Sequence, residues 1–240
     1  MRGLAFWSAS RCDPLPRRGR CGFSVPEILA VVAILSIILS ILLPSFQQAK
    51  RQAKQVLCQS NHRNIVLAAR TYSSENQQYL PFPNSNAYES SGLYTGPGWL
   101  YKAPNKSLPK HIEAGSLWPY LKDVRVYRCP MDEPPWNMGP VQKITSFGFN
   151  AELRSNVHLP STRTHQLRSN AVIMWETDET QGGGYWNDGN NLPNEHISRR
   201  HSNGANIGVI DGSIPWWTYD QWVINQLKIP GPLYCSPLRY

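Results

Sequence analysis

The sequence lacks a cluster of basic residues in its last two thirds, and this limits the partners that it can bind. Residues 1–75 hold 10 Lys or Arg against 3 Asp or Glu, whereas residues 76–240 hold 14 against 13. A surface that binds nucleic acid needs Lys and Arg gathered together. We therefore expect no nucleic-acid partner, although the whole chain carries a formal net charge of +8.

Motifs for two kinds of chemistry are also missing. The five cysteines form no CxxC pair and no Cys/His spacing of the kind that holds structural zinc, so we expect no thiolate metal site. No GxSxG motif is present to supply a strained nucleophile. With 240 residues, the chain has room for one membrane segment and one modest domain, which excludes a large multidomain enzyme.

One long apolar run is present near the N-terminus. It extends from Phe23 to Leu43, and Glu27 is its only charged residue. At about 1.5 Å per residue a helix of this length crosses a hydrocarbon layer of about 30 Å. The run is longer than that of a secretory signal, and no small-residue cleavage site follows it. We predict a basic leader over residues 1–22 and a transmembrane helix over residues 23–43.

The chain beyond Pro44 divides into a helical part and a part with strands and loops. Residues 44–76 continue the helical spacing, so we predict one helix of about fifty residues whose extramembrane half lies on a domain. Its expected apolar face comprises Phe46, Ala49, Ala53, Val56, Leu57, Ile65, Ala68, Ala69 and Tyr72. Residues 77–240 show short apolar segments broken by Pro and Gly, typical of strands and loops. The fold class is therefore α+β, with a small antiparallel sheet and long loops.

The clearest strand pattern is "RRHSNGANIGVIDGSIPWW" within residues 199–217. Asn203-Gly204 and Asp211-Gly212 have the composition of two-residue hairpin turns and flank an apolar strand. We predict a three-strand meander in this region. In that arrangement Asp211 and Gly212 occupy the two central positions of a type I′ turn.

The leader and the run resemble the type IV prepilin signature. Gly22-Phe23 followed by Glu27 and an apolar stretch matches the family's cleavage and methylation motif. The resemblance implies that a prepilin peptidase cuts between Gly22 and Phe23 and methylates Phe23. It further implies a pilin-like or pseudopilin subunit that joins other such subunits in a type II secretion or type IV pilus-like filament. Glu27 would then pair with the N-terminal ammonium of a neighbouring subunit, and the head would lie in the bacterial periplasm beside the inner membrane, which the chain crosses once.

The head resembles prepilin-like proteins that end in a His-x9-Asp-Gly domain. Here His201, Asp211 and Gly212 supply that motif. Cys58 and Cys129 match the cysteine-containing stretches of this subgroup, so the resemblance favours a disulfide between them. Either cysteine paired with Cys235 remains an alternative, because an exported head would lie in an oxidising compartment.

A histidine and an aspartate in one motif raise the alternative of an anchored hydrolase. A His oriented by an Asp is a common general base. If Asn203-Gly204 closes a hairpin, however, Asp211 lies about 17 Å from His201 at about 3.4 Å per residue. We therefore interpret His201 and Asp211 as structural and expect no catalytic residue.

The Gly-rich segment "WETDETQGGGYWNDGNNLPNEH" offers oxygen ligands that would suit calcium. Asp178 and Asp188 are its candidate ligands, together with Glu179, Asn190 and Asn191. Its spacing matches no EF-hand, so a solvated loop is the interpretation we favour, and no cofactor is required. Eight of the nine Trp residues lie in the head. Since aromatic platforms can bind ligands, the second functional hypothesis is a membrane-anchored binding module for carbohydrate or protein cargo.

Overall fold

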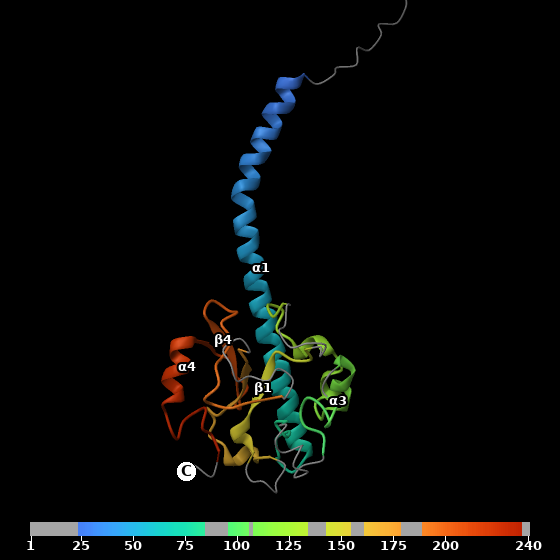
Figure 1. The fold of residues 1–240 in the computed structure, drawn as a ribbon, viewed down its shortest axis with the longest axis vertical. Helices are drawn as coiled ribbons and strands as arrows, with labels where there is room; N and C mark the ends of the chain where they lie inside the picture. The colour runs from blue at the N-terminus through green and yellow to red at the C-terminus, as the bar shows by residue number, and fades with distance from the viewer. Residues whose placement is uncertain are drawn as a thin grey trace, which may run out of the picture. The chain divides into compact units, whose positions relative to one another are not determined.

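The computed structural model describes residues 24–84, 96–105, 108–133, 143–154, 161–178 and 189–236. The chain divides into two compact units, with the division after Gln47. The helix α1 (Val25–Glu75) contributes to both units and contains Pro44 (Figure 1). Its 51 residues confirm the prediction of one helix of about fifty residues.

The described part of the first unit is mainly the apolar beginning of α1. Every large apolar side chain from Val25 to Leu43 is at least 47 % exposed. The serine hydroxyls of this stretch bond within the helix: Ser36 Oγ donates to the Val32 carbonyl at 2.8 Å and Ser40 Oγ to the Ile37 carbonyl at 2.7 Å. Such internal bonds are what a helix needs where no water is available. Among the described residues, α1 is the one helix long and apolar enough to cross a membrane.

In the second unit, the end of α1 packs on the head through one stripe. The buried residues of this stripe recur at intervals of three and four, as one helix face requires: Cys58, Asn61, His62, Ile65, Val66, Ala68, Ala69 and Ser73. Val56 and Leu57, which we expected on the apolar face, are 65 % and 53 % exposed. Asn61 lies inside because its amide donates two hydrogen bonds within the head, and the His62 ring packs against Phe147.

The head is built on a five-stranded sheet with the order β3-β1-β2-β4-β5. The strands are β1 (Phe147–Asn150), β2 (Val172–Glu176), β3 (Asn190–Asn191), β4 (Gly204–Val209) and β5 (Trp216–Thr218). Neighbouring strands are antiparallel except β1 and β3, which are parallel. The short elements are η1 (Pro109–Ala114), α3 (Trp118–Leu121), η2 (Val124–Tyr127), η3 (Ala151–Leu153), η4 (Thr164–Gln166) and α4 (Tyr219–Gln226). The protein is therefore α+β with a pilin-like arrangement of one long helix and a mostly antiparallel sheet.

Helices cover both faces of this sheet. Ile207 belongs to a buried cluster with Trp222 of α4, whereas the neighbouring Gly208 faces Val66 of α1. Successive residues of a strand point to opposite faces, so α1 and α4 lie on opposite sides. A Cβ on Gly208 would lie 2.5 Å from Met174 Cγ and 2.9 Å from Val66 Cγ2. The missing side chain thus allows α1 to approach the sheet closely.

The two predicted turns exist, but both differ in detail from the prediction. The first turn has Ser202 and Asn203 at its centre, with φ of 52° and 60°, and the His201 N–H donates to the Gly204 carbonyl at 3.2 Å. Gly204 already belongs to β4 and pairs with Thr218 of β5. No strand is assigned to residues 199–203, so in this described stretch the meander consists of β4 and β5 alone.

The second turn is a three-residue loop rather than the predicted type I′ turn. Gly212 has φ of +96°, whereas Asp211 does not have positive φ. The Gly212 N–H donates to the Val209 carbonyl at 3.0 Å, and the Val209 N–H donates to the Ser213 carbonyl at 3.1 Å. This is the pattern of a type I turn followed by a left-handed glycine. The extra residue explains why a two-residue turn was the wrong prediction.

Candidate functional site

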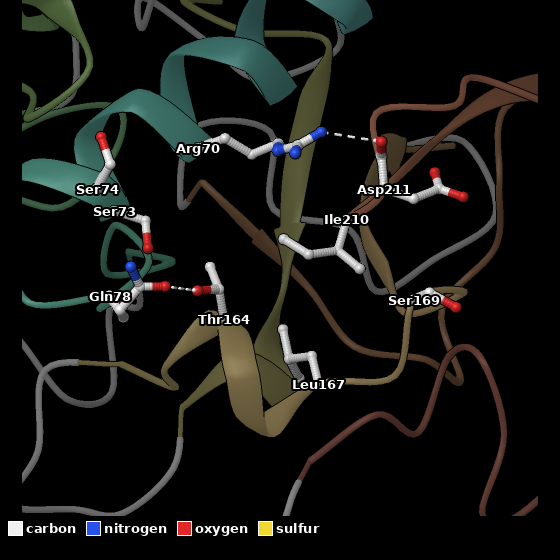
Figure 2. Close-up of a pocket in the computed structure, with 9 residues that line it drawn as sticks. All are labelled: Arg70, Ser73, Ser74, Gln78, Thr164, Leu167, Ser169, Ile210 and Asp211. Carbon is white, nitrogen blue, oxygen red and sulfur yellow. Dashed lines mark hydrogen bonds between the residues drawn. The ribbon is translucent and has the colours of Figure 1, made fainter.

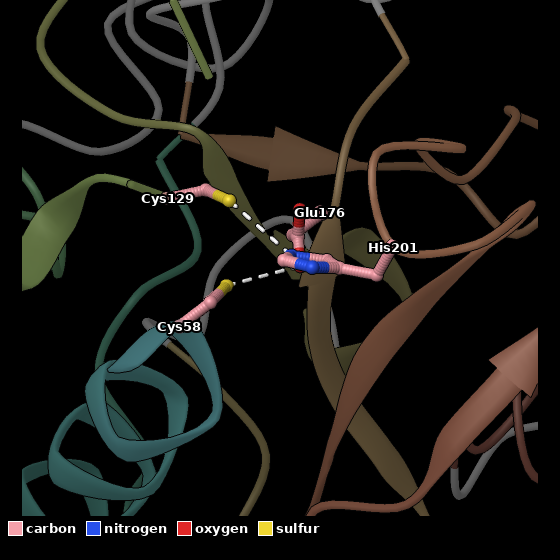
Figure 3. A group of neighbouring side chains, drawn as sticks. All are labelled: Cys58, Cys129, Glu176 and His201. Carbon is pink, nitrogen blue, oxygen red and sulfur yellow. Dashed lines mark hydrogen bonds and ion pairs between the residues drawn. The ribbon is translucent and has the colours of Figure 1, made fainter. Parts of the chain in front are cut away.

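Four side chains with metal-binding or acid–base chemistry meet inside the head. They are Cys58 of α1, Cys129 after η2, Glu176 at the end of β2, and His201 in the turn before β4. None is more than 2 % exposed. Figure 3 shows the two sulfur atoms, the carboxylate and the imidazole pointing toward one another.

Local interactions bring these four segments together. Asn61, one turn after Cys58, donates from Nδ2 to the carbonyls of Arg125 and Arg128 at 3.3 and 3.0 Å, which fixes the segment leading to Cys129 against α1. Glu176 is placed by the pairing of β2 with β1. His201 is held by Trp216, whose Nε1 donates to the His201 carbonyl at 2.9 Å.

The donor atoms of this group are close to one another. His201 Nε2 lies 3.0 Å from Glu176 Oε1 and 3.3 Å from Cys129 Sγ, and Cys58 Sγ lies 3.1 Å from the same Glu176 oxygen. Each of the four residues offers one donor atom, and these four atoms lie within 4.8 Å of one another. A single ion could therefore contact all four.

The histidine and the carboxylate form a buried ion pair. Burial alone would raise the pKa of Glu176, but the hydrogen bond and charge of His201 outweigh it and lower this pKa to about 2. Burial alone would lower the pKa of His201, but hydrogen bonds with Cys129 and Glu176 and the charge of Glu176 raise it to about 10. Burial raises the pKa of Cys58, whereas a hydrogen bond with Cys58 lowers the pKa of Cys129.

A second histidine lies beside the group. His62 Nε2 is 3.9 Å from Glu176 Oε1, and the His62 ring packs edge-on against Phe147 with centroids 4.4 Å apart. Burial lowers the pKa of His62 to about 4, so the ring is neutral at neutral pH. Among the described residues, neither nitrogen of His62 nor Nδ1 of His201 has a hydrogen-bond partner. The interior here contains polar atoms that the described protein groups leave unsatisfied.

The arrangement does not match a catalytic triad. In a triad, the histidine contacts the nucleophile with one ring nitrogen and the orienting carboxylate with the other. Here Cys129 and Glu176 both contact Nε2 of His201. The group is also buried, so a substrate has no direct access to it. Its chemistry is that of a closed metal site or a structural ion pair.

The predicted disulfide between Cys58 and Cys129 stays a prediction, since the structure shows the reduced form. Cys58, Cys129 and Cys235 are all free thiols. Cys58 and Cys129 are nevertheless neighbours, as the resemblance indicated, whereas Cys235 lies elsewhere, near Asn150 and the Val172 carbonyl. Glu176 contacts the sulfur of Cys58, and His201 contacts the sulfur of Cys129.

His201 and Asp211 have separate surroundings, as we expected. Asp211 Oδ1 accepts from the Ser213 N–H at 2.8 Å, and the Asp211 carbonyl accepts from Arg70 Nη1 at 2.9 Å. In Figure 2, Asp211 and Arg70 line a pocket together with Thr164 and Gln78. The Asp211 carboxylate serves the turn before β5 and is not a partner of His201.

The remaining predicted residues fall into two groups. Gly22, Phe23, Asp188 and Glu179 lie outside the described residues. Asp178 is described, and its backbone N–H donates to the His196 carbonyl at 3.2 Å. Asn191, another suggested calcium ligand, instead places its amide 2.7 Å from the Thr177 hydroxyl within the sheet. The calcium hypothesis stays a prediction, because Asp188 lies outside the described residues.

Glu27 is described and lies in the first turn of α1. Its Oε2 accepts from the Ser24 N–H at 2.7 Å and from the Ser24 hydroxyl at 2.8 Å. These bonds resemble a capping box, in which the third helical residue reaches back to the residue before the helix. Among the described residues, no donor to Oε1 is found.

Comparison with known proteins finds one stretch of significant similarity to a pilin. The chain is 32 % identical over 75 residues to the type IV major pilin protein PilA of Myxococcus xanthus, a match that covers 31 % of this chain and 32 % of that protein. No protein-family model matches the sequence. The comparison with solved structures gives no significant match.

Proposed function

We propose that this chain is a pilin-like subunit that a prepilin peptidase processes and that assembles through α1 into a type II secretion or type IV pilus-like filament. The observation that carries the proposal is the exposed apolar start of α1. Burying one aliphatic side chain contributes about 1.5–3 kcal/mol of free energy. We therefore expect this apolar helix segment to be buried against lipid or protein. Lipid covers it before assembly, and neighbouring helices cover it in a filament.

The similarity to a type IV pilin supports this proposal over a plain membrane anchor. Glu27 supports it further, since a carboxylate in a membrane helix is costly and is retained mainly where a partner needs it. Ser24 satisfies only Oε2 of Glu27 among the described residues. Oε1 is the atom that would accept from the ammonium of a neighbouring subunit.

The proposed location is the bacterial inner membrane, with the head on the periplasmic side. The proposed role is structural rather than enzymatic. In a catalytic triad the histidine contacts the nucleophile and the carboxylate with different ring nitrogens, whereas Cys129 and Glu176 both contact Nε2 of His201. Partners are the peptidase and other pilin-like subunits.

Processing is tested by expressing the full chain with and without an active prepilin peptidase and measuring the intact mass. We expect the loss of residues 1–22 and one added methyl group on Phe23. Gly22→Val should block cleavage, whereas Gly19→Val, a matched change in the same leader, should not. An intact leader beside an active peptidase would refute the proposal.

A further inference from the structure

The four donors gathered in the head are of the types that bind zinc. Two thiols, one imidazole and one carboxylate offer two sulfurs, one nitrogen and one oxygen. Zinc takes these ligands at about 2.3 Å for sulfur and 2.0–2.2 Å for nitrogen and oxygen, so the edges of its tetrahedron measure roughly 3.4–3.8 Å. The contacts of 3.0, 3.1 and 3.3 Å are slightly shorter than those edges, and all four donor atoms lie within 4.8 Å of one another.

We propose that Cys58, Cys129, Glu176 and His201 form a structural zinc site that joins the long helix to the sheet. The geometry is convergent: Cys129 and Glu176 approach the same nitrogen of His201, as ligands of one ion must. With four protein ligands, all buried, the site is closed and leaves no position for a substrate.

The surroundings of the ligands are those of a supported metal site. Ser198 Oγ donates to Glu176 Oε2 at 3.0 Å, which leaves Oε1 facing the other three donors. The Met131 N–H lies 3.4 Å from Cys129 Sγ and can donate to a thiolate. Groups that orient ligands in this way commonly surround the ligands of bound metals.

The donor set selects against other ions. Calcium prefers six or more oxygen ligands, and magnesium prefers octahedral coordination by oxygen. A site with two thiolates therefore excludes both ions. Thiolate and imidazole in a tetrahedral arrangement are typical of zinc. This zinc site is distinct from the Asp178 loop and independent of the proposed assembly of α1.

The site would stabilise a head whose sheet is small and whose connections are long. Its ligands come from α1, from the segment after η2, from β2 and from the turn before β4. Because a preformed site rarely exists in the unfolded chain, the free energy of zinc binding contributes to folding. Zinc also protects the thiols from oxidation to a disulfide, since the ligated sulfurs are no longer free to attack each other.

The first experiment measures the metal content of the full chain, purified in detergent after growth with added zinc. We expect close to one zinc per chain. Cys58→Ser and Cys129→Ser should lose at least nine tenths of it, whereas Cys235→Ser, which removes an equally buried cysteine outside the group, should keep it. Zinc-free wild-type protein, or equal loss in Cys235→Ser, would overturn the proposal.

A second experiment uses the wild-type protein, so its result cannot be affected by a variant that fails to fold. Wild-type protein stripped of metal is titrated with Co²⁺, which should give the strong visible bands of tetrahedral cobalt and a sulfur-to-cobalt charge-transfer band, both lost on adding Zn²⁺. Absence of these bands would overturn the proposal. So would a Cys58–Cys129 disulfide found by peptide mapping of unreduced protein extracted from cells.

Discussion

His201 Nε2 lies 3.0 Å from Glu176 Oε1, and neither side chain has more than 1 % of its surface exposed. Each group therefore compensates for the charge of the other. Removing one partner of a buried pair leaves an uncompensated charge, whereas replacing both can be nearly neutral. The effect of replacing one or both residues on stability can therefore be predicted even when no metal is bound.

In the presence of a chelator, His201→Leu and Glu176→Leu should each destabilise the head by about 3–5 kcal/mol, because each leaves a buried charge unpaired. The double variant should cost clearly less than the sum of the two. Denaturant unfolding of the four proteins measures this. Additive losses would show that the two side chains act independently.

Asn61 ties α1 to the segment that carries Cys129. Asn61→Ala removes two partly buried hydrogen bonds to the carbonyls of Arg125 and Arg128, each worth about 0.5–1.5 kcal/mol. We expect a lower melting temperature and weaker zinc retention. Asn64→Ala, an exposed site on the same helix, is the control and should change neither. Equal behaviour of the two variants would contradict the role given to Asn61.

Two variants in the turn before β5 distinguish a structural role of Asp211 from a catalytic one. Gly212→Val should destabilise the head by about 1–2 kcal/mol, because a β-branched residue is strained at a φ of +96°. Asp211→Asn should be mild, since its Oδ1 can still accept from the Ser213 N–H. Thermal unfolding and assembly are the measurements. A stable Asp211→Asn protein without function in cells would contradict the structural role.

Glu27 can act by capping α1 or by its charge, and two variants separate these roles. Glu27→Gln keeps an oxygen that can accept from Ser24, whereas Glu27→Ala removes it. If Glu27 pairs with a neighbouring ammonium, both variants should insert into the membrane but fail to enter filaments. Assembly of Glu27→Gln at the wild-type level would show that capping alone is needed.

The sequence predicts the main features of the fold but not the buried group of Cys58, Cys129, Glu176 and His201 in the head. The helix and the apolar strand β4 follow from periodicity and turn composition. The first turn is displaced by one residue from the prediction, because Gly204 is needed within the strand: a Cβ there would lie 2.2 Å from the Trp217 carbonyl oxygen. That close approach is invisible in a local pattern.

The four-residue group could not be predicted from spacing. Its members are separated by 71, 47 and 25 positions along the chain, and only the packing of α1 on the sheet brings them together. The expectation of no thiolate metal site rests on local motifs, and the proposed zinc site would have none. One signal was available: Glu176 ends the apolar strand "VIMWE", where a buried carboxylate needs a partner.

The most direct test of the account is whether the chain enters a filament. Cells that express the full chain with a prepilin peptidase and a pilus-assembly machinery are sheared, and the N-terminal sequence of the chain in the filament fraction is determined. We predict filament-associated protein that begins at methylated Phe23. Processed protein that stays entirely in the membrane fraction, under conditions where a known pilin assembles, would contradict the account.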